Sequence, residues 1–93
     1  MRIPNISDYP KVLHLGTETY KLKFIKGMKL VGSTDPGKKE IRIRAGMSKN
    51  ETFSTAIHEV LHLIELEWPV KLKHKTIYKL ESALFSFISD NFT

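Results

Sequence analysis

The spacing of the apolar residues changes near residue 46, and this change constrains the fold most. Before it, apolar and polar residues alternate at residues 19–26 and again at residues 40–44. A period of two is typical of strands that bury one face. After it, apolar residues recur three or four positions apart, as they do on a helix. We therefore predict a strand-rich first half and a helix-rich second half.

The first half predicts a small antiparallel sheet of three or four strands. Strands are expected at residues 11–15, 19–26, 30–34 and 40–44, with a turn at residues 35–37. The alternation gives this sheet one apolar face and one basic face, the latter formed by Lys21, Lys23, Arg42 and Arg44. We expect the basic face to be solvated and to discourage aggregation.

The second half predicts two helices. Ser48 and Glu51 fit a capping box, with Ser48 at the N-cap, so the first helix should run from there to about Glu67. Pro69 ends this helix, because proline disfavours helical geometry in the residue before it. The second helix should follow at residues 74–91. The expected fold class is α+β, with the sheet followed by two helices.

Length and composition narrow the classes of protein. The 93 residues fit one domain, residues 1–93, and the absence of cysteine leaves His, Asp and Glu as metal ligands. No apolar stretch approaches the roughly 18 residues that span a bilayer, and residues 1–5 lack the apolar core of a signal peptide. We expect a cytoplasmic protein with no membrane partner. The net charge of +5 permits weak attraction to nucleic acid without establishing it.

Residues 58–62, HEVLH, match the pattern HExxH and lie on the first predicted helix. His58 and His62 are one turn apart on one face, so both imidazoles can bind one zinc ion. Glu59 lies beside them, where its carboxylate can act as a base toward water. The motif therefore predicts a Zn²⁺ site with His58 and His62 as ligands and Glu59 as the catalytic residue.

A catalytic zinc site usually has three protein ligands and one open position. Glu81 is the first candidate for the third ligand, because it falls inside the apolar stripe of the second helix. A carboxylate there is costly unless it is paired or bound to metal. His74 is the rival, about two turns earlier on nearly the same face; it could bind zinc, position substrate or stabilise an oxyanion. Tyr78 is a further candidate helper.

The other acidic candidates are weaker. Glu65 and Glu67 follow the motif so closely on the same helix that we do not expect them to curl back onto the metal. Asp90 lies near the chain end, where fraying would weaken a ligand.

With HEVLH at residues 58–62 followed by YKLESAL at residues 78–84, the chain resembles the gluzincin metallopeptidases. In those enzymes an active-site helix carries two histidines and a later glutamate helix carries the third ligand. The short length resembles the minigluzincins and similar small phage-encoded metallopeptidases. The resemblance implies a zincin-like fold, zinc ligands His58, His62 and Glu81, and Glu59 as general base and acid.

The resemblance also implies a peptide or protein substrate, bound as an added strand at the edge of the sheet. We expect residues 40–44 to form that edge. Minigluzincins are described as latent zymogens whose terminal segments occlude the cleft, and here residues 1–10 or 89–93 would do so. The 93 residues leave no room for the second subdomain of larger gluzincins, so we expect latent or restricted activity.

Two alternatives without catalysis stay open. One is a zinc-stabilised module that binds nucleic acid, suggested by the charge. Single-strand binders place aromatics among basic groups, whereas Tyr20 and Phe24 should face away from Lys21 and Lys23, so we do not expect a nucleic-acid partner. The other alternative is a protein-interaction domain that retains the fold.

Overall fold

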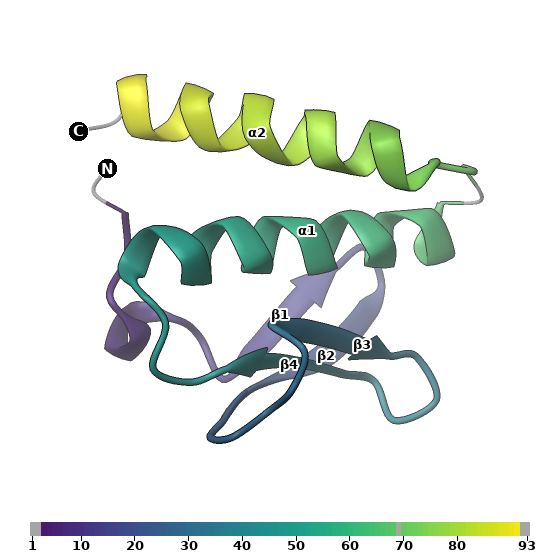
Figure 1. Cartoon of the computed structure of the whole chain (residues 1–93). Helices are drawn as coiled ribbons and strands as arrows, with labels where there is room; N and C mark the ends of the chain where they lie inside the picture. The colour runs from purple at the N-terminus through teal and green to yellow at the C-terminus, as the bar shows by residue number, and fades with distance from the viewer. Residues whose placement is uncertain (1–2, 69, 92–93) are drawn as a thin grey trace.

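The computed structural model describes residues 3–68 and 70–91 and shows an α+β fold, in which four strands precede two helices. The strands are β1 (Val12–Leu15), β2 (Glu18–Ile25), β3 (Gly32–Asp35) and β4 (Glu40–Arg44), and the helices are α1 (Lys49–Glu67) and α2 (His74–Asn91). Figure 1 shows α1 lying over the sheet and α2 lying antiparallel to α1 on its other side. Ser54, His58 and Glu81 therefore come from two helices packed side by side.

The sheet is mixed, which corrects the prediction of an antiparallel sheet. Its strand order is β1-β2-β4-β3, with antiparallel pairing of β1 with β2 and of β3 with β4. The central pair, β2 and β4, is parallel, with Leu22 opposite Ile41 and Phe24 opposite Ile43. The chain after β2 therefore passes to the far edge, forms β3, and returns through a hairpin as β4 between β2 and β3.

The composition of the strands explains this order. β4 carries Ile41 and Ile43, which are fully buried, whereas β3 reads GSTD and has no large apolar side chain. Burial of apolar surface favours β4 in the interior and leaves the polar strand at the edge. The expectation that residues 40–44 form the free edge is therefore wrong, and the edge beside α1 is β3.

The main core lies between the sheet and α1. It consists of Tyr20, Leu22, Ile41, Ile43 and Leu63. The Tyr20 hydroxyl is buried and donates a hydrogen bond to Glu67 at the end of α1. Burial, and then this hydrogen bond, raise the pKa of Tyr20 to about 12. Glu67 thus joins the end of α1 to the sheet.

Both helices have the predicted bounds. Ser48 caps α1, since its hydroxyl oxygen accepts a hydrogen bond from the Glu51 N–H at 3.2 Å. The helix ends at Glu67, and the Trp68 N–H still donates to the Ile64 carbonyl at 2.9 Å. Pro69, the predicted stop, lies outside the described residues. Among residues 3–68 and 70–91, no helix is long and apolar enough to cross a membrane.

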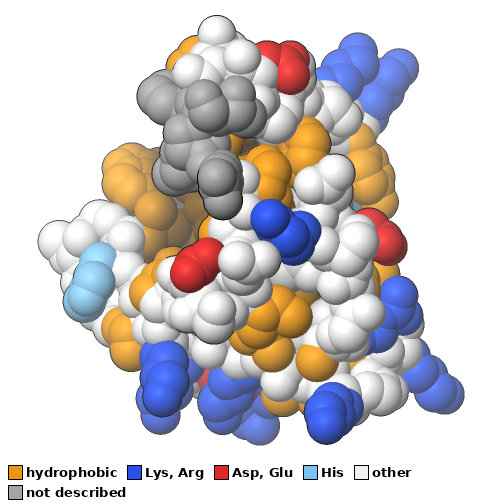
Figure 2. Space-filling view, turned by 90° about the vertical axis from the view of Figure 1, so that its left-hand side faces the viewer, with side chains coloured by type: hydrophobic (Ala, Val, Ile, Leu, Met, Phe, Trp, Pro, Cys, Tyr) orange, Lys and Arg blue, Asp and Glu red, His pale blue; other side chains and the backbone are white. Residues whose placement is uncertain are grey.

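The outer face of the sheet is charged, but it is not purely basic. Glu40 is buried there, with its carboxylate 2.7 Å from Lys23 Nζ and 2.9 Å from an Arg42 nitrogen. Hydrogen bonds from Lys23 and Arg42 lower the pKa of Glu40 below its usual value. Figure 2 shows Lys and Arg side chains spread along the lower edge of one end of the molecule, with other side chains between them.

Candidate metal centre

The two motif histidines face each other across one turn of α1. Their Nε2 atoms are 3.1 Å apart, and both side chains are partly buried. Two imidazole nitrogens that share a tetrahedral zinc ion lie about 3.3 Å apart, given a zinc–nitrogen distance of about 2.0–2.1 Å. The structure therefore brings His58 and His62 together with the spacing that the motif predicts.

The other nitrogen of each ring is next to a carboxylate. His58 Nδ1 is 2.7 Å from Glu81 Oε1, and His62 Nδ1 is 3.2 Å from Glu65 Oε1. Because a carboxylate accepts hydrogen bonds, these contacts favour the tautomer of each ring in which Nδ1 carries the proton. Each Nε2 then presents a lone pair to the other. Two lone pairs at this distance need a cation or a proton between them, and a zinc ion satisfies both.

Glu81 reaches the site from α2, as predicted, but it lies at Nδ1 of His58 rather than beside the facing nitrogens. Its second oxygen accepts a hydrogen bond of 2.5 Å from the Ser54 hydroxyl. The Glu81 carboxylate, which lies inside the apolar stripe of α2, therefore has two hydrogen-bond partners on α1. Ser54 was not among the predicted residues, although its position four residues before His58 places it on the same face.

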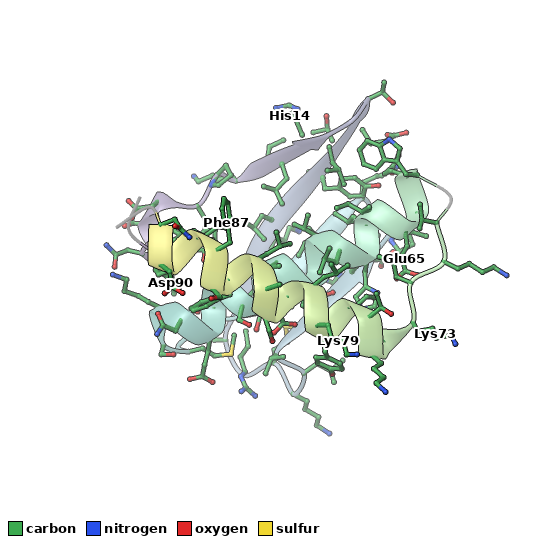
Figure 3. All side chains as sticks on the ribbon, turned by 90° about the horizontal axis from the view of Figure 1, so that it is seen from above. His14, Glu65, Lys73, Lys79, Phe87 and Asp90 are labelled. Atoms are coloured by element: carbon green, nitrogen blue, oxygen red, sulfur yellow. The ribbon has the colours of Figure 1, made fainter. Side chains whose placement is uncertain are left out.

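Glu65 has a role that the sequence analysis missed. Glu65 was expected to lie too close to the motif to reach the metal. It instead contacts the other side of the His62 ring, at Nδ1, because it lies three residues after His62 on the same helix. Its Oε2 accepts a hydrogen bond from the Leu72 N–H at 3.0 Å, which also fixes the connection between the helices. Figure 3 shows Glu65 near the end of α1 that leads into this connection.

Glu59, the predicted catalytic residue, is buried between α1 and the edge strand β3. Only 6% of its surface is exposed, and its Oε1 accepts a hydrogen bond of 2.8 Å from the Thr34 hydroxyl. A Cβ atom at Gly32 would lie 3.1 Å from Glu59 Oε2 and 2.7 Å from Thr55 Cγ2. Gly32 and Thr34 therefore let the carboxylate sit against the strand and fix its direction.

His74 and Tyr78 complete an aromatic group around the motif. The ring centroid of His74 lies 5.1 Å from that of His62 and 5.9 Å from that of His58, and Tyr78 lies 5.1 Å from His58. Both side chains come from the first two turns of α2 and are exposed to solvent. The structure thus places both predicted helpers next to the histidine pair.

Two hollows open on this site, and both are bordered by Gly32, His58 and Glu59. The larger, of about 490 Å³, is lined by all three clustered histidines together with Glu59 and the edge strand. The smaller, of about 260 Å³, is lined instead by Tyr78 and Glu81. The site is therefore reached from solvent along β3.

The terminal segments do not cover these hollows in the described part of the chain. Residues 3–10 and the end of α2 lie where α1 begins, at the opposite end from the connection that leads to His74 (Figure 1). Tyr9 packs there against Phe24, with ring centroids 5.4 Å apart. The expected occlusion by residues 1–10 or 89–93 is not seen for residues 3–10 and 89–91, and the other four residues lie outside the described ones.

The histidine pair suits zinc, but a third ligand is not in place. Among residues 3–68 and 70–91, no three His, Asp or Glu side chains are already arranged to hold a metal ion. Glu81 and His74 both lie close enough to be considered, and either must move its side chain to complete the set.

Comparison of the chain with family models, with curated proteins and with solved structures found no match. The functional assignment therefore depends on the motif and on the geometry of the site.

Proposed function

We propose that the chain is a zinc-dependent metallopeptidase of restricted specificity. The observation that carries this proposal is the pair of Nε2 atoms of His58 and His62, 3.1 Å apart and next to the buried carboxylate of Glu59. His58 and His62 would hold the ion, with a third ligand from α2. Zinc bound there would lower the pKa of a water ligand and polarise a peptide carbonyl.

Glu59 is the proton carrier in this proposal. Its Oε1 is held by Thr34, so Oε2 is the oxygen left to take a proton from the attacking water. The same carboxyl group then gives that proton to the nitrogen of the leaving amine. Burial under β3 keeps bulk water away from this exchange and fixes the carboxylate in one position.

The edge strand β3 offers a binding surface for an extended peptide. β3 pairs with β4 on one side, and no strand among residues 3–68 and 70–91 pairs with its other edge, where a substrate strand could add. The larger hollow beside it also has apolar walls from Leu30 and Leu66, which are 65% and 54% exposed. We expect a substrate with an apolar side chain near the cleaved bond.

The alternative of a nucleic-acid-binding module receives less support. Glu40 neutralises part of the sheet face that would meet phosphates, through its contacts with Lys23 and Arg42. Tyr20 and Leu22 are buried on the opposite face of β2, the strand that carries Lys23, and cannot stack on bases.

Metal removal tests the proposal. The protein loaded with zinc should cleave unstructured peptides, a chelator should abolish the cleavage, and added zinc should restore it. His62→Ala should lower cleavage by at least about 100-fold, because it removes one of the facing nitrogens. His14→Ala, at an exposed position on β1, is the matched control and should cleave as the wild type does. Zinc-loaded wild type that cleaves no peptide, or cleavage that survives complete metal removal, would contradict the proposal.

A further inference from the structure

We propose that His74 is the third protein ligand, so that the site is a three-histidine centre, with Glu81 and Glu65 as positioning residues that hold the rings of His58 and His62. This inference depends on the proposed zinc site and specifies its ligand set. It differs from the set that the resemblance to gluzincins implies, in which Glu81 binds the metal.

The first argument for His74 is that both oxygens of Glu81 and of Glu65 already have hydrogen-bond partners. Glu81 uses one oxygen for His58 Nδ1 and the other for the Ser54 hydroxyl. Glu65 uses one oxygen for His62 Nδ1 and the other for the Leu72 N–H. To bind a metal between the facing Nε2 atoms, either carboxylate would have to give up the histidine contact that orients the ring.

The contacts of Glu81 and Glu65 are those expected of residues behind metal ligands. A histidine that binds a metal through one nitrogen usually donates its other N–H to a carboxylate, a carbonyl or water, and this fixes the tautomer and the ring orientation. Both motif histidines have such a partner. The two carboxylates therefore already have a role, and the third ligand is to be sought elsewhere.

The ring distances point to His74. Three imidazoles that bind one tetrahedral zinc ion have ring centroids about 5.2 Å apart, given the usual zinc–nitrogen distance. The centroids here are 4.8 Å apart for His58 and His62, 5.1 Å for His62 and His74, and 5.9 Å for His58 and His74. The three rings are thus close to the required spacing.

His74 is also free to turn toward the ion. It is the first residue of α2 and is exposed, and its ring nitrogens make no hydrogen bond with any described residue. Rotation between staggered side-chain conformations therefore breaks no contact of this kind. No third ligand is already in position among the described residues. A rotation of the His74 side chain would bring one into position without breaking a hydrogen bond.

The hollows support the same ligand set. Glu59 and His58 line both hollows, but His62 and His74 line only the larger one, and Glu81 lines only the smaller one. An ion held by the three histidines would face the same space as the catalytic carboxylate and the edge strand. Three neutral imidazoles would also leave the ion its full charge of +2, which favours acidification of a water ligand.

The test counts histidine ligands in the zinc-loaded full chain by NMR with ¹⁵N-labelled histidine. The chain has four histidines, and we expect three of them to bind zinc through Nε2, with His14 unbound. His74→Ala should show two bound histidines and bind zinc at least about 100-fold more weakly. Glu81→Gln should keep three bound histidines and lose about 10- to 100-fold in affinity, with a changed Nδ1 signal of His58.

Two controls keep the outcomes separate. His14→Ala removes a histidine on β1, which Figure 3 shows at the rim of the view, away from Glu65, and should leave zinc affinity unchanged. Amide spectra would show whether each variant is folded. Two bound histidines in the wild type, with zinc affinity insensitive to His74→Ala and abolished by Glu81→Gln, would overturn the inference and leave the peptidase proposal intact. A wild type that binds no zinc would overturn both.

Discussion

Thr34 on the edge strand β3 donates a hydrogen bond of 2.8 Å to the carboxylate of Glu59 on α1. This contact joins the strand proposed to bind substrate to the residue proposed to move the proton. Thr34→Val keeps the shape of the side chain and leaves a buried carboxylate oxygen without its partner, which costs about 1–3 kcal/mol.

We expect Thr34→Val to lower kcat by about tenfold or more, with zinc affinity unchanged, because the hydroxyl touches the base and neither histidine. Peptide hydrolysis and a zinc titration on the same sample would measure both. Thr19→Val, at an exposed position on β2, is the matched control. A variant at Thr34 with the kcat of the wild type would show that the contact does not position the base.

The close approach of β3 to α1 predicts the effect of Gly32→Ala. The added methyl would lie 2.7 Å from Thr55 Cγ2 and 3.1 Å from Glu59 Oε2, so strand and helix must separate. We expect a loss of about 1–3 kcal/mol in the free energy of unfolding, measured by urea denaturation, and a loss of activity. Gly27→Ala is a poor control because Gly27 has a φ of 73°, whereas Gly37→Ala meets only the Asp35 side chain, at 3.4 Å. Equal stability of the Gly32 and Gly37 variants would argue against a tight contact.

Burial of Tyr20 predicts a loss of stability at alkaline pH. Its pKa is raised from 10.0 to about 12 in the folded protein, so the unfolded chain loses the proton first. Stability from this group is complete below pH 10 and is lost as the pH rises from 10 to 12. Tyr20→Phe should therefore weaken the dependence of the free energy of unfolding on pH in this window, in urea titrations at several pH values. The same dependence in both proteins would mean that the hydroxyl is not buried as described.

Ile77 should contribute most to the packing of α2, since it is fully buried. Ile77→Ala leaves a cavity between the helices, and we expect it to cost about 2–5 kcal/mol in thermal or urea unfolding. Leu80→Ala, one turn further along, removes a side chain that is 37% exposed and should cost clearly less. Equal costs would indicate that α2 does not pack on α1 through Ile77.

The two helices and the pair of facing histidines, His58 and His62, could be predicted because their sequence signals are local. Ser48 and Glu51 mark the start of α1, and the spacing of His58 and His62 on a helix fixes their relative position. Strand order could not be derived in this way, because alternation shows which face of a strand is buried but not which strand lies beside it. The polar composition of β3 was the available signal for the edge.

The partners of the site residues were the hardest part to predict. Glu81 was found because a carboxylate in an apolar stripe needs a partner, yet the sequence does not show which nitrogen of His58 it meets. Ser54 and Thr34 are small polar residues of a common kind, and only the packing of α2 and β3 against α1 gives them their roles. Glu65 had a local signal, its spacing of three residues from His62.

The most direct test of the proposed activity compares wild type with Glu59→Gln at equal zinc content. The substitution keeps the size of the side chain and removes the carboxylate that would accept the proton. With zinc measured at one ion per chain in both proteins, we predict that the wild type hydrolyses an unstructured peptide and that Glu59→Gln is slower by at least about 1,000-fold. Equal rates in the two zinc-loaded proteins would contradict the account.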